Sequence, residues 1–221
     1  MNKNKPLRVR ARDLSPRQRH TRAGFKRSID CYERCMLKHP ARSVFHSRAE
    51  LYHAALLESD PTVTSYVPQP FSLSISGKMY IPDCYVVQSG KRRVIELKPR
   101  GEFDDALHEP LAAYFSLQGM VFEVVPNEWA LNRSMEAENW LQIISVLHTG
   151  QALDTDVDES QILIQFQRQP TLALGEILDP GDRLGSLSNE VALFRLLHRG
   201  VITSNLSDAP LDYSTEFKLC T

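Results

Sequence analysis

The chain has 221 residues, of which 42% are hydrophobic and 24% charged, and its formal net charge is −1. This composition is typical of a folded protein and argues against a disordered chain. No apolar run is long enough to span a membrane, and the N-terminus lacks the apolar segment of a secretory signal, so we expect a cytoplasmic protein.

Charge is unevenly distributed along the chain. Residues 1–50 carry 14 lysines and arginines against 4 acids, whereas residues 51–221 carry 12 against 23. Residues 1–40 are therefore predicted to form a basic arm, extended or partly ordered, that meets a polyanionic partner. Its basic side chains include Arg8, Arg10, Arg12, Arg17, Arg19, Arg22, Lys26 and Arg27.

The four cysteines are too few for a disulfide framework in a chain of this length. Cys31, Cys35 and His39 follow one another at intervals of four residues and would share a helix face, which is one way to hold zinc. Structural zinc usually takes ligand pairs from two chain segments. We therefore favour small buried residues on a short helix.

The segment after the arm predicts a helix followed by a sheet. Ser47 and Glu50 form an S-x-x-E capping box, which starts a helix that runs to Ser59. Proline and glycine residues then divide a β-rich region into short pieces. The predicted strands are Val63–Val67, Phe71–Ile75, Met79–Val87 and Arg92–Lys98.

A helix over 104–118 and a strand over 120–125 follow. The order of strand, helix and strand predicts a crossover that joins two parallel strands. A further helix is predicted over 128–147. Residues 41–149 would thus form one α/β domain, in which a mixed sheet is flanked by helices.

The last part of the chain predicts a smaller domain. Residues 150–159 are acidic and carry little bulk, which is typical of a linker. Helices followed by a two-stranded ribbon then suggest a winged-helix-like C-terminal domain over 150–221. The predicted helices span 160–166 and 188–199, and the predicted strands span 201–206 and 214–219.

Two carboxylates and an amine stand out in the predicted sheet. Side chains alternate along a strand, so Glu96 and Lys98 share one face while Leu97 points to the other. A turn at Gly90 brings Asp83, on the preceding strand, opposite Glu96. Carboxylates suit Mg²⁺, and an ammonium group beside them orients or activates a water and neutralises charge on a phosphate. This set predicts metal-assisted hydrolysis of a phosphodiester.

Each of these features also has an ordinary structural interpretation. An E-x-K pattern decorates the solvent face of many amphipathic strands. Capping can be the whole role of Glu50, whose carboxylate would then bond the Ser47 backbone N–H as the last member of the capping box. The charged run 91–93 can be a solvated turn, and His53 is expected on the helix surface.

Together these residues resemble the motif of the restriction-endonuclease-like nucleases, in which a P-D pair is followed by a strand and (D/E)-x-K. The stretch 46–98 is most similar to TnsA, the endonuclease subunit of the heteromeric transposases of Tn-seven-like elements. The resemblance covers about residues 40–125. It rests on Glu50 in the helix, Asp60-Pro61, Gln69 within V-x-x-x-V-P-Q-P, Pro82-Asp83, and Glu96-x-Lys98.

The resemblance implies a role for each matching residue. Asp83 and Glu96 would bind Mg²⁺, for which Mn²⁺ would substitute. The main-chain carbonyl of Leu97 and the carboxylate of Glu50 would complete the protein ligands, and Lys98 would position the attacking water. Gln69 is expected near the site. The residues expected to contact DNA are Arg17, Arg19, Arg22, Lys26, Arg27, Arg92, Arg93 and Arg100.

The resemblance also implies partners. A TnsA-type endonuclease of a bacterial cytoplasm would cleave the non-transferred strand near the 5′ ends of a transposon. It would work with a TnsB-like transposase and a TnsC-like ATPase regulator, with an RNA-guided targeting complex as a further partner. Two alternatives stay open: a restriction or junction-resolving nuclease of the same fold that acts alone, and an inactive DNA- and protein-binding scaffold.

The predicted C-terminal domain has the wrong charge for an unaided DNA-binding module. Residues 150–221 carry 5 basic against 11 acidic residues, and phosphate neutralisation supplies most non-specific affinity for DNA. We therefore expect this domain mainly to dock a protein partner or to help place the nuclease, with Arg195 and Arg199 as its only phosphate contacts.

Overall fold

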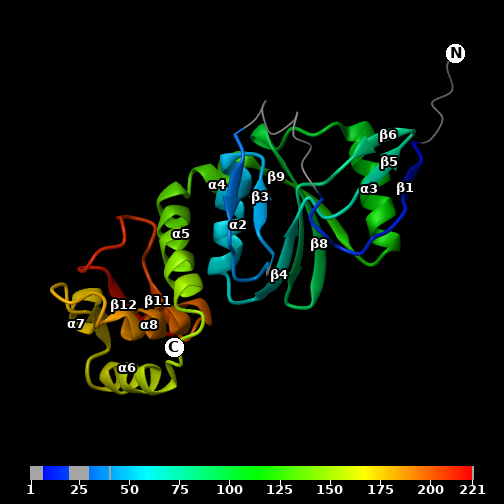
Figure 1. Cartoon of the computed structure of the whole chain (residues 1–221). Helices are drawn as coiled ribbons and strands as arrows, with labels where there is room; N and C mark the ends of the chain where they lie inside the picture. Colours follow the sequence, from blue (N-terminus) through cyan, green and yellow to red (C-terminus); the bar gives the residue numbers. More distant parts are fainter. Residues whose placement is uncertain (1–6, 20–29, 40, 221) are drawn as a thin grey trace, which may run out of the picture. The chain divides into compact units, whose positions relative to one another are not determined.

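The computed structural model describes residues 7–19, 30–39 and 41–220 (Figure 1), and the expected DNA contacts Arg22, Lys26 and Arg27 lie outside these ranges. The chain is a mixed α/β protein, as its sequence predicts. No helix within the described ranges is long and apolar enough to cross a membrane.

The chain divides into two compact units. The first unit holds the described residues up to Arg34, together with 38–53 and 62–132. The second holds 35–37, 54–61 and the described residues from Arg133 onward.

A four-stranded sheet is the centre of the first unit. Its strands are β4 (Val63–Pro68), β7 (Cys84–Gln88), β8 (Lys91–Lys98) and β9 (Val121–Pro126), in the order β4-β7-β8-β9. β7 pairs antiparallel with both β4 and β8, whereas β8 and β9 are parallel. The chain passes from β8 to β9 through α3 (Asp105–Leu117), so the predicted crossover is confirmed.

A smaller antiparallel sheet takes in part of the basic arm. It has the order β1-β5-β6, with β1 at Val9–Ala11, β5 at Leu73–Ile75 and β6 at Lys78–Tyr80. Ser76 and Gly77 connect β5 to β6 with φ angles of 49° and 88°, which are typical of a primed hairpin turn. The arm is thus extended at β1, where it forms the edge strand of this sheet.

The strand predicted over 79–87 is wrong, because the structure divides it between two sheets. Lys78–Tyr80 pairs with β5, whereas Cys84–Gln88 is β7 of the four-stranded sheet. Pro82 lies between them and has no N–H to donate to a strand ladder, which favours a break here. The break leaves Asp83 immediately before β7.

A two-stranded ribbon precedes the first helix of the described residues. β2 (Tyr32–Arg34) pairs antiparallel with β3 (Ser43–Phe45), so the short helix expected over 31–39 is wrong. His39 is buried, and its Nδ1 lies 2.7 Å from the hydroxyl of Ser43. The three residues considered for zinc therefore do not share a helix face.

The first helix of the described residues, α2 (Arg48–Ser59), confirms the predicted one. The hydroxyl of Ser47 accepts a hydrogen bond from the Glu50 N–H at 3.1 Å, as in a capping box. His53 is only 3% exposed, and its ring lies 5.6 Å from that of Trp129. The expectation that His53 lies on the helix surface is therefore wrong.

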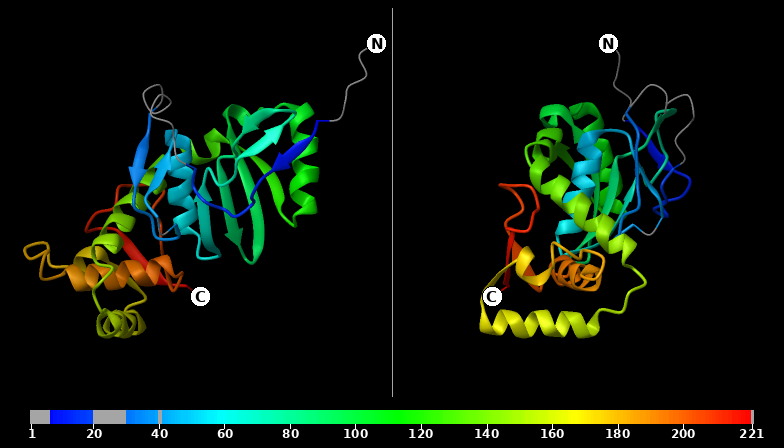
Figure 2. Two further views of the ribbon diagram at one scale, coloured as in Figure 1. Left: turned by 45° about the vertical axis from the view of Figure 1, so that its right-hand side comes forward. Right: turned by 60° about the vertical axis from the view of Figure 1, so that its left-hand side comes forward.

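The core of the first unit lies between its four-stranded sheet, its three-stranded sheet and α3. In Figure 1 and in the left view of Figure 2, α3 runs beside the strands of this unit. The ring of Phe115 on α3 lies 6.1 Å from that of Phe71 and 5.9 Å from that of Phe122 on β9. The buried members of this core are Phe71, Leu73, Ile75, Tyr85, Val94, Leu111, Phe115, Met120 and Phe122.

The second unit combines helices with a three-stranded antiparallel sheet of order β10-β12-β11. Its named helices are α5 (Ser134–Thr149), α6 (Asp156–Arg168), α7 (Leu174–Ile177) and α8 (Leu187–His198), and its strands are β10 (Thr171–Ala173), β11 (Ile202–Ser204) and β12 (Glu216–Leu219). The sequence predicts β11 and β12. It does not reveal β10 or α7, which are too short to produce a periodic pattern.

Two predicted boundaries are wrong. The helix expected over 128–147 is two helices, α4 (Asn127–Leu131) in the first unit and α5 in the second. The linker expected over 150–159 ends early, because α6 begins at Asp156. Three acids lie in the first turn of α6, where negative charge favours the positive end of the helix dipole.

Arg195 on α8 is used inside the second unit, which contradicts the expected phosphate contact. Its guanidinium donates to three main-chain carbonyls within 150–153, at 2.8 to 3.3 Å, and to the hydroxyl of Thr155 at 2.6 Å. Arg199 forms an ion pair with Glu159 and keeps about half of its side chain exposed. Arg195 thus holds the chain that joins α5 to α6.

Replacing Arg195 by alanine is expected to lower the free energy of unfolding by about 2 kcal/mol, because three carbonyls and a hydroxyl lose a charged donor. Urea denaturation followed by circular dichroism would measure the change. Arg168→Ala, at an exposed position at the end of α6, is the matched control and should change stability by less than about 0.5 kcal/mol. Equal losses in the two variants would contradict the structural role of Arg195.

Candidate active site

At one end of the four-stranded sheet, three neighbouring strands each have a polar residue in them or directly next to them. Gln69 follows β4, Asp83 precedes β7, and Glu96 lies in β8. Cys84 pairs with Ile95, so the next residues outward, Asp83 and Glu96, stand opposite one another. On the other side of β7, the N–H of Gln69 donates to the carbonyl of Asp83 at 2.9 Å. The structure therefore brings Gln69, Asp83 and Glu96 into one row across the sheet.

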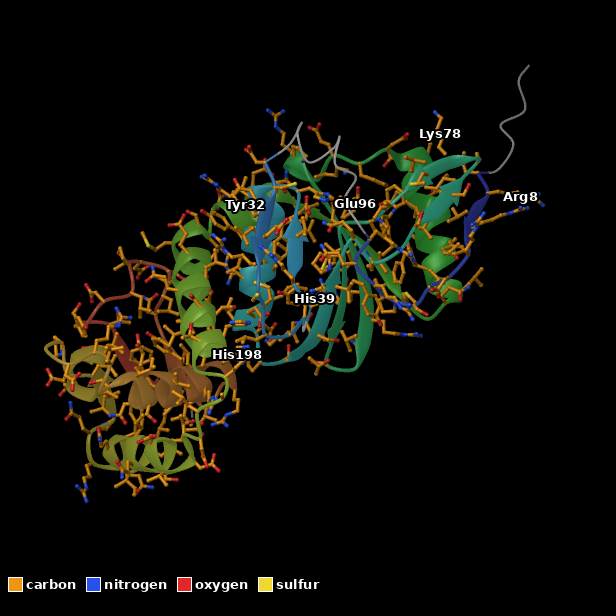
Figure 3. All side chains as sticks on the ribbon, in the orientation of Figure 1. Arg8, Tyr32, His39, Lys78, Glu96 and His198 are labelled. Atoms are coloured by element: carbon orange, nitrogen blue, oxygen red, sulfur yellow. The ribbon has the colours of Figure 1, made fainter. Side chains whose placement is uncertain are left out.

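Glu96 and Lys98 lie on the same face of β8. The Nζ of Lys98 lies 2.5 Å from the Oε1 of Glu96. Leu97 between them is 6% exposed, as expected for a residue that points into the core. Glu96 itself is only 3% exposed, and Figure 3 shows it within the first unit, whereas Arg8 and Lys78 lie at the surface.

One oxygen of Asp83 is held by the neighbouring strand. Its Oδ2 accepts a hydrogen bond from the Leu97 N–H at 2.7 Å. The N–H and C=O of one residue point to the same side of an extended strand. The carbonyl of Leu97 therefore faces the side on which Asp83 lies, in agreement with the ligand set that the resemblance implies.

Glu50 reaches this row from the first turn of α2. Its carboxylate accepts hydrogen bonds from the His46 N–H at 3.1 Å, from the Ser47 hydroxyl at 3.1 Å and from the side-chain amide of Gln69 at 2.7 Å. The expected bond to the Ser47 N–H is thus replaced by one to His46. Gln69 connects the helix to the sheet.

Burial makes two carboxylates of this site, Asp83 and Glu50, harder to ionise, because it raises their pKa values. Burial, followed by the charges of Glu96 and Glu50, raises the pKa of Asp83 well above its ordinary value. Burial also raises the pKa of Glu50, against hydrogen bonds that favour its ionised form. For Lys98, burial opposes the charge, but the bond to Glu96 and the nearby carboxylates raise its pKa. Lys98 is therefore a cation and a donor at neutral pH.

The donor chemistry fits a hard divalent cation that keeps some of its water. Asp83 and Glu96 offer carboxylate oxygens on adjacent strands, and a cation would offset the cost of burying their charges. Within the described part of the chain, no three His, Cys, Asp or Glu side chains are placed to hold a metal ion together. The two carboxylates, the Leu97 carbonyl and waters would thus hold the cation, a pattern usual for Mg²⁺.

Glu50 does not complete a three-carboxylate cluster in this arrangement. Three donors already hold its carboxylate, and it acts on Asp83 through its charge. Direct ligation of a metal by Glu50 would require at least one of these hydrogen bonds to be exchanged.

Tyr80 on β6 is a site residue that sequence reasoning missed. Its hydroxyl donates to the Oε2 of Glu96 at 2.6 Å, so Tyr80 and Lys98 each hold one oxygen of Glu96. Burial and the charge of Glu96 raise the pKa of the Tyr80 phenol, which remains a neutral donor. No local pattern marks Tyr80, because the contact joins strands of two different sheets.

Two non-glycine residues in or near this row have a left-handed backbone. Gln69 has a φ of 41°, and Arg100, two residues after Lys98, has a φ of 55°. Such residues cost on the order of 1 kcal/mol each, and they cluster at functional sites where the surroundings hold them in place. The backbone on both sides of the row is therefore under constraint.

The arginines expected to contact DNA differ in how exposed their side chains are and in the contacts that they already make. Arg100 lies two residues after the end of β8 and has 81% of its side chain exposed, with the Oε1 of Glu102 3.9 Å from its guanidinium, and Arg17 is also exposed. Arg19 is half-buried. Arg92 donates to a main-chain carbonyl and Arg93 is ion-paired along the sheet, so their use on DNA would break existing contacts.

No model of a known protein family matches the chain, and no curated protein sequence matches it.

Replacing Asp83 by asparagine is expected to stabilise the metal-free protein by about 1 kcal/mol at pH 8, because it removes one of several clustered buried charges. An amide oxygen can still accept the Leu97 hydrogen bond. Because folding raises the pKa of Asp83, the stability that its proton contributes is complete below the unfolded value of 3.8 and is lost as pH rises through the folded pKa.

The advantage of Asp83→Asn should therefore shrink as the pH falls from 8 towards 4. Urea unfolding at several pH values would measure it. Glu109→Gln, on the exposed side of α3, is the control and should show no such pH dependence. A destabilised Asp83→Asn protein at pH 8 would contradict the account of clustered charges.

Proposed function

We propose that the protein is a metal-dependent DNA endonuclease. The observation that carries this proposal is the position of Asp83 opposite Glu96, with Lys98 on the same face of the sheet. Two carboxylates and an ammonium group around a hydrated divalent cation form a set that can hydrolyse a phosphodiester. The pKa values of Asp83 and Glu50 are raised, so these buried carboxylates are unfavourable when ionised without a cation. This supports a site that binds a cation rather than one that stabilises the fold.

The site residues would divide the work of hydrolysis. Asp83, Glu96 and the Leu97 carbonyl would hold Mg²⁺, or Mn²⁺ in its place, and the ion would supply Lewis-acid activation of the phosphate and of a water. Lys98 would donate to the attacking water or to a phosphate oxygen and stabilise the charge that develops there. Because Lys98 stays protonated, it acts as a donor and not as the base.

The arrangement of the strands supports a restriction-endonuclease-like fold for the first unit. Its sheet is mixed, a crossover through α3 joins the parallel pair, and the site residues lie where β7 begins and β8 ends. In the second unit, α6 and α8 are followed by the antiparallel strands β11 and β12, an order that supports a winged-helix-like module.

Within this fold, the sequence motifs favour a TnsA-type transposon endonuclease of the bacterial cytoplasm. It would cut the non-transferred strand near the 5′ ends, while a TnsB-like transposase acts on the 3′ ends under a TnsC-like ATPase, with an RNA-guided complex as a further partner. The use of Arg195 and Arg199 inside the acidic second unit supports dependence on partners, because few cations remain there for phosphates.

One observation favours a second candidate, an inactive scaffold that binds DNA and protein. Both oxygens of Glu96 already have protein partners, Lys98 and Tyr80, so Glu96 does not need a metal to be paired. Calorimetry separates the two candidates. A scaffold would bind neither Mg²⁺ nor Mn²⁺ at millimolar concentrations, whereas the nuclease would bind both.

Replacing Lys98 by alanine is expected to reduce cleavage at least about 100-fold, because it removes the donor that stabilises developing charge. The assay would use labelled transposon-end DNA with Mg²⁺ and the transposase and ATPase of the same element, and EDTA should abolish the cut. Lys218→Ala, exposed on β12, is the matched control. Retained cleavage by a folded Lys98→Ala protein would reject the assignment, and cutting by the protein alone would favour a stand-alone nuclease.

Replacing Tyr80 by phenylalanine is expected to weaken Mn²⁺ binding about tenfold, because one oxygen of Glu96 loses the donor that orients it. Isothermal calorimetry would give the affinity. Tyr213→Phe, at a partly exposed position in the second unit, is the control and should bind Mn²⁺ like the wild type. An unchanged affinity in Tyr80→Phe would show that the phenol is only a packing group.

A further inference from the structure

The basic arm makes backbone contacts close to the candidate site. The N–H of Arg17 donates to the carbonyl of Pro70 at 3.2 Å, and the N–H of Arg19 donates to the carbonyl of Gln69 at 3.1 Å. The arm thus runs along residues 69–70, and Gln18 is the residue between the two that make these bonds. Both donors are main-chain N–H groups, so neither bond depends on the charge of an arginine side chain.

The orientation of the Gln18 amide is set by a backbone. Its Oε1 accepts from the Val44 N–H at 3.2 Å, and its Nε2 donates to the Val44 carbonyl at 2.6 Å. Val44 lies in β3 opposite Glu33, and both its N–H and its carbonyl are hydrogen-bonded to the Gln18 side chain. A backbone N–H can only donate and a carbonyl can only accept, so the Gln18 amide has one orientation.

This orientation is passed on to Glu50. The second hydrogen of the Gln18 Nε2 is donated to the Oε1 of Gln69 at 2.8 Å. The amide nitrogen of Gln69 therefore faces the other way and donates to the Oε2 of Glu50 at 2.7 Å. Gln69 is 4% exposed, so water has little access to replace either bond.

We propose that Gln18 is a positioning residue of the metal site, which holds Glu50 through Gln69. The basic arm would then form part of the wall of the site in addition to contacting DNA. This inference rests on the proposed function, in which Asp83, Glu96 and the Leu97 carbonyl would hold the metal and Glu50 would act on that site through its charge. The chain of donors itself, from Val44 through Gln18 and Gln69 to Glu50, depends only on the geometry.

A simpler role for Gln18 would be to fasten the arm to β3. The two bonds to Val44 would suffice for that role, and the bond to Gln69 would then have no effect on Glu50. Gln18→Met removes the bonds to both Val44 and Gln69 at nearly the same side-chain length, so what happens at Gln69 and at the metal site distinguishes the two roles. It leaves the main-chain bonds of Arg17 and Arg19 available to hold the arm.

Two measurements on the full chain test the proposal. The first follows the side-chain amide signals of Gln69 in ¹⁵N–¹H spectra, which report on its bond to Glu50 without any metal. The second measures Mn²⁺ affinity by calorimetry. In Gln18→Met we expect the Gln69 signals to shift and the Mn²⁺ affinity to fall about tenfold. Gln161→Met, exposed on α6, is the control and should change neither.

The outcomes are distinct. Unmoved Gln69 signals in Gln18→Met would overturn the chain of donors, and moved signals with an unchanged Mn²⁺ affinity would overturn the positioning of Glu50. A wild-type protein that binds no Mn²⁺ would overturn the proposed metal site itself. In that case, the Gln69 signals alone still decide whether Gln18 orients Gln69.

Discussion

The register between β7 and β8 is the constraint on which the candidate site depends. Gln88 pairs with Lys91, which leaves only Ser89 and Gly90 in the turn, and their φ angles of 48° and 74° are typical of a primed two-residue hairpin. Such a turn fixes which residues stand opposite one another. A slip by one residue would move the Glu96 and Lys98 side chains to the other face of the sheet. A tight turn at one end of the hairpin therefore places the carboxylates at the other.

With this register, the carboxylates of Asp83, Glu96 and Glu50 lie together in a buried place. The surrounding residues reduce the free-energy cost of burying these like charges. The Leu97 N–H holds Asp83, Lys98 and Tyr80 share the two oxygens of Glu96, and Gln69 holds Glu50. None of these donors removes the electrostatic conflict, because the pKa values of Asp83 and Glu50 remain raised. A cluster that costs stability and could be replaced by amides is more easily explained by function than by folding.

The sequence predicts the parts of this site that depend on local pattern, and it misses those that depend on distant contacts. Alternation along β8 places Glu96 and Lys98 together, and the capping box predicts the start of α2. The strands β1, β2 and β3 have only three residues each, too few to show a period. Tyr80 and Gln18 act across sheets and loops, so no spacing reveals them. Arg195 was expected on phosphate because its charge is visible in the sequence, whereas the carbonyls that it binds are not.

The arm illustrates why charge alone gives an incomplete account of a basic segment. In β1, Val9 and Ala11 pack against the core, while Arg8, Arg10 and Arg12 alternate with them and are exposed. β1 pairs with β5, β5 pairs with β6, and β6 carries the tyrosine that holds Glu96. This row of cations is thus connected to the site through paired strands and one short hydrogen bond. A phosphate backbone bound along β1 would therefore be held at a fixed position relative to the carboxylates, as the proposed cleavage at a defined place would require.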